Sequence, residues 1–486
     1  MTAYEPVIGL EVHAELLTRS KMFCPCAVVD STQAAPNTVT CPVCLGMPGV
    51  LPVINRQAVE FGLMVGLALH CEIPPFNQFA RKSYFYPDLP KGYQISQYEL
   101  PLAINGYIDI DLPDGSSRRI RVRRAHLEED TGKLTHTGNG KSLVDLNRAG
   151  VPLLEIVSEP DIHSAEEAEA YIRKLRSILE YLGVNSGDMS KGVLRVEPNI
   201  SVRPAGSDEL RTRTEVKNLN SIRSLARATA KEIERQIGIW ESGGAVQQAT
   251  LGWDEDRQTL VIQRVKESAS DYRYFPEPDL PVLEMSREWV EEVRARLPEL
   301  PDAKRDRFIR DLGLSRYDAV VLVADRAVAE YYEAALAAGG EPKPVANLMI
   351  SELFRLMNAD GLDRADVGGI RVTPQALADL TKLVAAGTLN STTAKKVLDA
   401  LYHEGGVPAE IVRARGLAQV TDEAPIRAAI ARVLAANPAE VQAYLAGSEK
   451  VIKFLMGLAM RELRGQGQPQ TVQRLLAEAL EQRRQV

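Results

Sequence analysis

Alternating apolar and polar residues mark short strands in the first half of the chain. The alternation covers residues 6–12, 107–111, 119–123, 194–203 and 260–265. Side chains in a strand point to opposite faces in turn, so residues two apart share a face. Asn105-Gly106 and Asp114-Gly115 favour the positive backbone angles of tight turns, which predicts an antiparallel meander in this region.

Helical spacing of apolar residues occurs between these strands. It covers residues 56–69, 165–182 and 221–242, and Ser164 with Glu167 three residues later is a capping pattern for the second of these helices. Strands and helices mixed with antiparallel pairing favour an α+β fold over a doubly wound sheet.

The pattern changes near residue 293, where strand signals nearly vanish and helical spacing continues to the end of the chain. Helices are predicted over residues 303–312, 316–324, 326–338, 344–358, 373–386, 391–403, 408–415, 424–436, 438–446, 449–464 and 471–482. Pro298 and Pro301 mark one junction, and Gly405-Gly-Val-Pro408 marks a second. The expected division is a catalytic body over 1–292 and two all-α modules over 293–407 and 408–486.

Length and charge restrict the functional classes. A chain of 486 residues exceeds one ordinary core, and a net charge of −7 requires any nucleic-acid contact to come from local basic patches. The first residues lack the pattern of an export signal, and no apolar run reaches the roughly 18 residues of a membrane span. A cytoplasmic protein with no membrane contact is therefore expected.

Five short polar clusters lie mostly in strand-like surroundings, and their residue types indicate metal-assisted chemistry on phosphate and carboxylate groups. They are Glu11-Val-His13, His126-Leu-Glu128-Glu129-Asp130, Glu155 with its neighbours, Glu197-Pro-Asn199-Ile-Ser201 and Glu215-Val-Lys217-Asn218-Leu-Asn220. Carboxylates and imidazoles from several strands on one face are how a protein holds Mg²⁺ beside a nucleotide. A solvated polar sheet face is the alternative for any single cluster.

Four of the five cysteines form two close pairs, Cys24-Pro-Cys26 and Cys41-Pro-Val-Cys44. Two such pairs favour a tetrahedral Zn²⁺ site, with reduced unliganded thiols as the alternative. Four sulfur ligands leave no open position, so this zinc would be structural. Cys71 follows an apolar run and is expected to be buried as a small hydrophobic residue.

Several common catalytic motifs are absent from the chain. It has no Gly-x-x-x-x-Gly-Lys-Ser/Thr loop, no dinucleotide fingerprint and no Gly-x-Ser-x-Gly elbow. Residues 81–97 and 266–279 instead concentrate cations, phenols and amides, which suit phosphate and base contacts, although each alone also fits an ordinary surface loop. Direct phosphoryl transfer needs only positioning, Mg²⁺ and cations, so it is favoured over acyl transfer through a protein nucleophile.

Eight motifs in order closely resemble the B subunit of the bacterial aspartyl/glutamyl-tRNA amidotransferase, the GatB type. They begin with Ile8-Gly-Leu-Glu11-Val-His13 and Tyr84-Phe-Tyr-Pro-Asp88 and end with Val216-Lys-Asn-Leu-Asn-Ser221 and Asp271-Tyr-Arg-Tyr-Phe-Pro-Glu-Pro-Asp279. The resemblance covers essentially the whole chain. It implies a glutamine-synthetase-like cradle domain with an antiparallel sheet, a helical linker domain and a YqeY-like helical tail that contacts tRNA.

The resemblance also implies the reaction and the partners. ATP would phosphorylate the side-chain carboxylate of Glu-tRNA(Gln) or Asp-tRNA(Asn), and ammonia from a partner amidase A subunit would displace the phosphate. A small C subunit would complete a heterotrimer. Sequence does not decide between the two substrates, and a free-standing glutamine-synthetase-like ligase and a non-catalytic tRNA-binding scaffold remain as rivals.

The family's site residues carry over by position. Catalysis and Mg²⁺ binding fall on Glu11, His13, Glu128 and Glu155, and Glu197 is a further Mg²⁺ ligand where family members often have aspartate. The candidates for contacts with ATP and the aminoacyl end are Lys82, Tyr84, Lys91, Ser96, Gln97, Lys217, Asn218 and Arg273. Cationic residues of the tail, including Lys450, Lys453, Arg461 and Arg464, are expected to face outward, with Val451, Phe454, Leu455 and Leu458 forming a buried stripe.

Overall fold

The computed structural model describes residues 3–265, 272–419, 422–448, 450–463 and 466–484. The chain forms two compact units, Met1–Pro301 and Asp302–Val486, which are described separately. Residues 266–271 of the second predicted contact loop, and Glu449 and Arg464 of the tail, lie outside the described residues.

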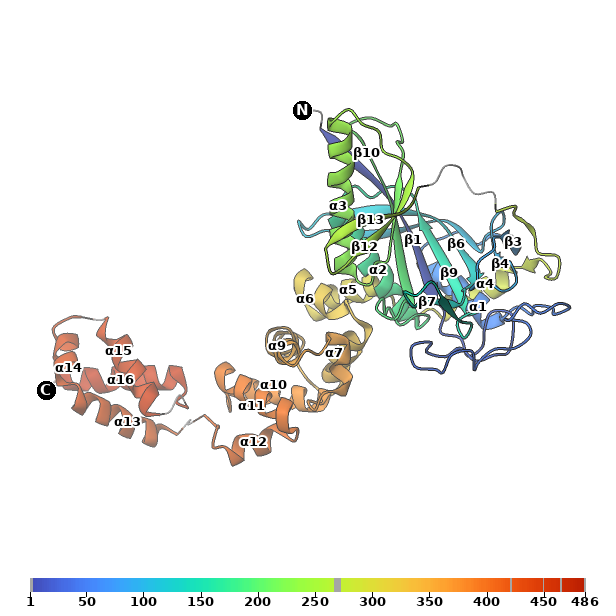
Figure 1. Ribbon diagram of the computed structural model, residues 1–486. Coiled ribbons are helices and arrows are strands. Elements are labelled where there is room, and N and C mark those ends of the chain that lie inside the picture. The colour runs from blue at the N-terminus through green and yellow to red at the C-terminus, as the bar shows by residue number, and fades with distance from the viewer. Residues whose placement is uncertain (1–2, 266–271, 420–421, 449, 464–465, 485–486) are drawn as a thin grey trace. The chain divides into compact units, whose positions relative to one another are not determined.

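An eight-stranded sheet forms the centre of the first unit (Figure 1). Its order is β13-β12-β11-β10-β1-β9-β6-β5, and every neighbouring pair is antiparallel except β11 with β12. The strands are β1 (Tyr4–Glu15), β5 (Ala103–Asp111), β6 (Ser117–Glu129), β9 (Pro152–Ser158), β10 (Leu194–Pro204), β11 (Thr214–Lys217), β12 (Ala249–Asp254) and β13 (Thr259–Val265). The predicted α+β class is confirmed.

The central strand β1 shows how the sequence pattern becomes two different faces. Ile8, Leu10, Val12 and Ala14 are buried in the main hydrophobic core, whereas the residues between them point to the opposite face. Helices α1 (Arg56–Ala68), α2 (Ala165–Leu182) and α3 (Ile222–Glu241) contact strands of this sheet and add their apolar residues to the same core. The other face of the sheet therefore carries the polar clusters.

Both long helices begin where the capping pattern predicts. The Ser164 side chain accepts a hydrogen bond from the Glu167 backbone N–H, and Ser221 accepts one from Ser224 in the same way. Each cap satisfies a donor that the first turn leaves without a helical partner. Helix α2 ends at the predicted residue, and α3 ends one residue before the predicted one.

The predicted hairpin in the 100s is correct at one turn and wrong at the other. The turn that contains Asp114-Gly115 connects β5 to β6, as expected. Asn105-Gly106 instead lies inside β5, with Asn105 at φ 55°. Glycine is required at 106 because a Cβ there would lie 2.3 Å from the Cys71 sulfur and 2.5 Å from the Leu69 carbonyl oxygen. Cys71 itself is buried, as predicted.

Short strands form three small sheets beside the main one. β3 (Ala80–Ser83) pairs with β4 (Tyr93–Ser96) and with β14 (Phe275–Pro276). β2 (Phe76–Asn77) pairs with β15 (Leu283–Glu284), and β7 (Lys133–His136) pairs with β8 (Ser142–Asp145). The first of these sheets is the most important here, because β4 lies next to the end of β6.

The end of the first unit contains a helix that the sequence pattern did not predict, α4 (Arg287–Ala295). The boundary expected at residue 292 falls inside this helix. Val293 is buried in the first core, and Leu297 and Leu300 pack against that core, which keeps this segment in the first unit.

The second unit is helical in its described residues. It contains α5 (Pro301–Leu312), α6 (Arg316–Val323), α7 (Arg326–Ala337), α8 (Pro342–Leu348), α9 (Phe354–Ala359), α10 (Pro374–Ala385), α11 (Ser391–Glu404), α12 (Pro408–Ala414), α13 (Glu423–Ala436), α14 (Pro438–Leu445), α15 (Val451–Glu462) and α16 (Pro469–Arg484). The single helix expected over 344–358 is interrupted by a π-helical turn over Met349–Leu353, and a 3₁₀ turn spans Arg364–Gly369. Two separate hydrophobic cores occur, one built from Phe308 to Val412 and one from Ile426 to Leu480.

The tail helix α15 corrects one expectation. Phe454 was expected in the buried stripe, but its side chain is 53% exposed, whereas Leu455 is fully buried. Neighbouring positions on a helix differ by about 100°, and on α15 the buried side is centred on Leu455 and Ala459, which leaves Phe454 outside it. In the described part of the chain, no helix has both the length and the apolar composition needed to cross a membrane.

Candidate functional site

Strand register brings the predicted acidic residues together on the polar face of the sheet. Glu11 of β1 lies opposite Glu197 of β10, and His13 of β1 lies opposite Glu155 of β9. His126 of β6 lies opposite the same Glu155. Directly opposed residues in an antiparallel pair project to the same face, so these side chains meet across four adjacent strands.

Three of these residues form a first donor group, His13, Glu128 and Glu155, whose ligand atoms all lie within 4.8 Å of one another. His13 Nε2 is 3.5 Å from a Glu155 oxygen. His126 adds a second imidazole, with Nε2 at 3.1 Å from Glu128 Oε1 and 3.3 Å from Glu155 Oε2. Glu128 and His126 are almost completely buried, so this end of the face excludes bulk water.

The two imidazoles determine the charge of the buried carboxylates. Burial by itself would raise the pKa of Glu155, but the charge and hydrogen bonds of His126 and His13 outweigh it and hold that pKa well below its usual range. Burial would lower the pKa of His126, yet Glu155 and Glu128 raise it to about 9. The carboxylates of Glu128 and Glu155 are therefore ionised, and they lie beside two imidazoles whose pKa values are raised.

A second donor group lies beside the first and contains Glu11, Glu197 and Glu215, again with all ligand atoms within 4.8 Å. The Lys217 ammonium donates to Glu197 at 2.9 Å and lies 3.2 Å from Glu215. The Asn199 amide donates to Glu11 at 3.1 Å. Burial and the charges of Glu155, Glu197 and Glu215 raise the pKa of Glu11.

The five expected Mg²⁺ ligands are thus divided between two groups instead of sharing one. Glu215 completes the second group, although no ligand role was predicted for it from the sequence. The available signal was the strand period, because Glu215 lies two residues before Lys217 and so shares its face. His126 was recognised in a cluster but not assigned, and its central place between Glu128 and Glu155 depends on the β6–β9 register.

Both groups fit a small divalent cation by the chemistry of their donors. Mg²⁺ prefers hard oxygen ligands at about 2.0–2.1 Å in octahedral geometry, which places adjacent ligand atoms about 3 Å apart and opposite ones about 4 Å apart. The first group offers two carboxylates and an imidazole, and the second offers three carboxylates, with ligand atoms up to 4.8 Å apart that would have to draw slightly closer around the ion.

Ser96 and Gln97, expected to contact nucleotide, are both buried against β6. Ser96 Oγ donates to Glu128 Oε1 at 2.6 Å, and the Gln94 amide donates to Glu128 Oε2 at 3.1 Å. Gln97 Oε1 accepts the Leu127 backbone N–H at 3.0 Å, while its amide nitrogen is buried without a hydrogen-bond partner in the described structure. These side chains hold the end of β6 and thereby orient Glu128.

Lys82 and Tyr84 lie beside the first donor group. The charges of Glu128, Tyr274 and Glu155 outweigh burial and raise the pKa of Lys82, whose ammonium lies 5.1 Å from the centre of the Tyr272 ring. Burial raises the pKa of Tyr84. A cation faces the carboxylates here without an ion pair to them in the described residues.

The other predicted contact residues lie at different places. Asn218 is exposed directly after β11 with φ 66°, and Arg273 is exposed with φ 46°. Lys91 is half-buried and its ammonium is hydrogen-bonded to both carboxylate oxygens of Glu129. Tyr98 and Tyr274 stack with ring centres 4.1 Å apart near Arg124.

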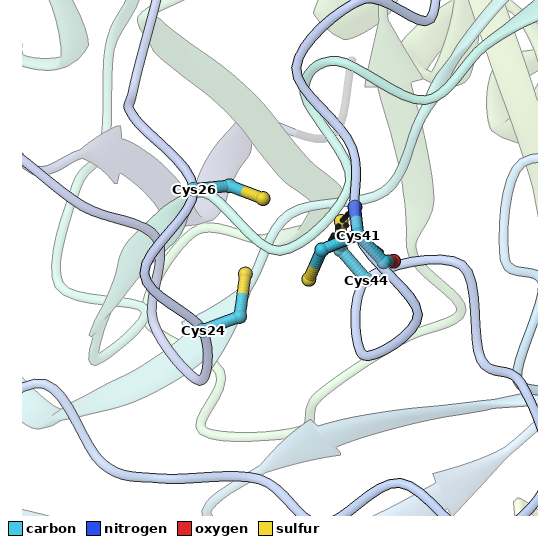
Figure 2. A group of neighbouring side chains, drawn as sticks. All are labelled: Cys24, Cys26, Cys41 and Cys44. Carbon is cyan, nitrogen blue, oxygen red and sulfur yellow. Dashed lines mark hydrogen bonds between the residues drawn. The ribbon is translucent and has the colours of Figure 1, made fainter.

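The four cysteines predicted to bind zinc lie together in the structure. Their sulfur atoms all lie within 4.8 Å of one another, and Figure 2 shows the Cys24 and Cys26 side chains approaching those of Cys41 and Cys44. The Cys41 and Cys44 sulfurs are 3.9 Å apart. A tetrahedral zinc with bonds of about 2.3 Å has sulfur–sulfur edges of about 3.8 Å, so the group fits Zn²⁺. The hydrogen bond between Cys24 and Cys44 lowers the pKa of Cys44 and raises the pKa of Cys24, and burial raises the pKa of Cys26, so Zn²⁺ would have to displace thiol protons on binding.

Comparison with known families assigns the first unit. The family model described as "GatB/GatE catalytic domain" matches residues 6–291, which include every donor described above. The chain belongs to the GatB/GatE family. A second model, described as "GatB domain", matches residues 330–480.

Relatives of this GatB-family chain match it over nearly its full length. The B subunit of the aspartyl/glutamyl-tRNA(Asn/Gln) amidotransferase of Moorella thermoacetica is 52% identical, covering 98% of this chain and 100% of the relative. The protein of the same name from Thermodesulfovibrio yellowstonii is 50% identical, covering 99% and 100%. That from a Roseiflexus species is 50% identical, covering 98% of both chains.

Proposed function

We propose that this GatB-family chain catalyses the ATP-dependent transamidation of Glu-tRNA(Gln), Asp-tRNA(Asn) or both, as a glutamine-dependent carbon–nitrogen ligase. The observation that carries the proposal is the pair of donor groups on one sheet face, with Lys82 beside them. The family and the full-length match to amidotransferase B subunits support the tRNA substrate over a ligase for free amino acids. Two converging acidic groups also disfavour a non-catalytic scaffold.

The reaction needs activation because ammonia does not displace an oxide from a carboxylate. Phosphorylation of the side-chain carboxylate by ATP forms an acyl phosphate, which supplies a leaving group for the incoming ammonia. A divalent cation such as Mg²⁺ neutralises phosphate charge during this transfer. His13, Glu128 and Glu155 would hold one cation, and Glu11, Glu197 and Glu215 would form the other acidic pocket, with Lys217 compensating part of its charge.

Residues around the donor groups position the two substrates. Lys82 is close enough to Glu128 and Glu155 to feel their charge but makes no ion pair with them, which suits a cation that binds the anion delivered between them. Tyr84, Tyr272 and Tyr274 form an edge-to-face aromatic series beside Lys82, a surface suited to a base or to the aminoacyl end. Asn218 and Arg273 remain exposed candidates for the same contacts.

The cysteine group would hold a structural Zn²⁺. Four sulfur donors saturate a tetrahedral ion, so it supplies no chemistry beyond linking the segment at Cys24 to the segment at Cys41. In a chain outside an oxidising compartment, a metal is the means of cross-linking two such loops.

Partners and compartment follow from the reaction. Ammonia has to come from a separate amidase, the A subunit, with a small C subunit completing the complex. The substrate is an aminoacylated tRNA for translation, which places the activity in the cytoplasm. In the tail, Lys453, Phe454 and Arg461 are exposed on α15 and Lys450 is exposed at its N-cap, and these cations have no ion pair in the described residues. Phosphate neutralisation and base stacking use such residues, which supports a tRNA contact there.

Glu128→Gln tests the proposed reaction. The substitution keeps the shape but removes the charge, so ATP-dependent amide formation in the complex should fall by at least a hundredfold. Glutamine hydrolysis by the partner amidase should persist. Glu159→Gln is the matched control, since the pKa of Glu159 is likewise lowered by a cation, but that cation is Arg123 and the pair is not part of either donor group. Near-normal transamidation by the Glu128 variant would refute the assignment.

A further inference from the structure

The two sides of the end of β6 have different environments. Glu128 faces the first donor group, and Glu129 points to the opposite side because strand side chains alternate. The Glu129 carboxylate there lines a small cavity whose other walls include Cys24, Cys44, Lys91 and Ile95. The cysteine group and the proposed catalytic carboxylate thus lie on opposite sides of one strand end.

The second cysteine loop contacts this strand end through Lys91. Gly46, two residues after Cys44, packs so closely that a Cβ would lie 2.7 Å from Lys91 Cγ and 2.9 Å from its backbone nitrogen. The Lys91 ammonium bonds both Glu129 oxygens, and Glu129 also accepts the Ile95 backbone N–H at 2.9 Å. Glu129 is 3% exposed, so Lys91 is the cation that compensates a buried charge.

The first cysteine loop contacts the same place through the backbone. The Lys21 N–H donates to the Cys26 carbonyl at 2.9 Å, and the Met22 N–H donates to the Gly150 carbonyl at 2.7 Å. The Gly150 N–H in turn donates to the Asp130 carbonyl at 2.9 Å. Both halves of the cysteine group are therefore linked to residues 129–130, the first through Gly150 and the second through Lys91.

Strand β4 connects this support to Glu128. Its Ile95 is bonded to Glu129, while the neighbouring Gln94 and Ser96 side chains donate to the two oxygens of Glu128. The Gln94 amide also donates to the Glu129 carbonyl at 2.8 Å. A displacement of Lys91 or of the cysteine loops would shift β4 and the donors that orient Glu128.

We propose that the four-cysteine group is the outer support of the Glu128 site, and that Lys91 is a positioning residue acting through Glu129. The inference rests on the proposed function in taking Glu128 as a Mg²⁺ ligand and the four cysteines as a zinc site. It replaces the expected role of Lys91 as a nucleotide contact. A Lys91 that left Glu129 to bind phosphate would leave a buried carboxylate without its cation, with the Ile95 N–H as its remaining donor.

Lys91→Met tests the coupling in the full-length chain within its complex. Supporting partners of metal ligands typically change metal affinity by about 10- to 100-fold. Titration with Mg²⁺ alone, followed by calorimetry, should show a loss in that range, and transamidation should need correspondingly more Mg²⁺. The KM for ATP at saturating Mg²⁺ should stay near the wild-type value. Lys91→Arg, which keeps the cation, should recover most of the affinity.

Lys304→Met is the control, because Lys304 is likewise a lysine bonded to a glutamate, Glu333 at 2.7 Å, but it lies in the second unit, where Arg307 also pairs with Glu333. It should leave Mg²⁺ binding unchanged. Removing the cysteine-bound metal from the wild-type protein should weaken Mg²⁺ binding as Lys91→Met does, which tests the support even if that variant folds poorly. Unchanged Mg²⁺ affinity in both experiments, or a raised KM for ATP alone, would overturn the coupling. If Glu128→Gln abolished transamidation but Lys91→Met bound Mg²⁺ normally, only this inference would be overturned, and the proposed reaction would stand.

Discussion

Ser96→Ala is the sharpest test of how Glu128 is oriented. The Ser96 hydroxyl donates to Glu128 Oε1 over 2.6 Å, and both residues are at most 2% exposed. Burial would raise the pKa of Glu128, but His126 and Lys82 hold it below its usual value, so the hydroxyl donates to an ionised acceptor. Removing this donor should weaken the hold on a carboxylate that has to meet Mg²⁺.

The magnitude follows from the number of remaining donors. A hydrogen bond to a charged group contributes about 1.5–3 kcal/mol. Gln94 and His126 still contact Glu128 at 3.1 Å, so the lower part of that range applies. At about 1.4 kcal/mol per factor of ten, Mg²⁺ affinity should fall about 10- to 30-fold. The assay is the Mg²⁺ dependence of transamidation at saturating ATP, with Mg²⁺ titration calorimetry of the same complex.

Ser224→Ala provides the control for losing a buried hydroxyl. Ser224 donates to Glu255 over the same 2.6 Å and lies on α3, away from the donor groups. It should affect thermal stability without moving the Mg²⁺ dependence. If Ser96→Ala instead raised the KM for ATP and left the Mg²⁺ titration unchanged, Ser96 would be a nucleotide contact and the reasoning from its hydrogen bond would be refuted.

Three further predictions concern the remaining groups. With a zinc chelator, four thiols should become reactive towards a disulfide reagent at pH 8, while Cys71 stays protected until unfolding because burial raises its pKa to about 12. Four reactive thiols before any chelator is added would exclude the metal site. Lys217→Met leaves Glu197 and Glu215 without their cation, so thermal stability should fall in Mg²⁺-free buffer and recover when Mg²⁺ is added. A loss of stability that Mg²⁺ does not restore would argue against cation binding by this group. Replacing Lys453 and Phe454 by alanine should weaken tRNA binding and reduce its salt dependence, while the complex without tRNA keeps its glutaminase activity. An unchanged affinity for tRNA at moderate salt would show that α15 does not contact tRNA.

The sequence by itself determined which residues belong to the polar face. The period of two along β1 puts Glu11 and His13 on one side and Leu10 and Val12 on the other, whatever the neighbouring strands are. The helical period and its capping serines likewise determined most helix limits to within a few residues. The paired cysteines and the ordered motifs of the family were equally visible, since they depend only on local spacing. The three-domain division stays a prediction.

Tertiary structure decided how the polar residues are grouped. The registers of β1 with β9 and β10 separate His13 from Glu11 into two donor groups, and the register of β10 with β11 brings Glu215 to the second. Tertiary packing likewise joins Lys91 to Glu129, 38 residues along the chain, and leaves Phe454 outside the core of the tail. These outcomes depend on residues distant in the chain. Local periodicity determines which face of the sheet a side chain occupies, but the register between distant strands determines which atoms it contacts there.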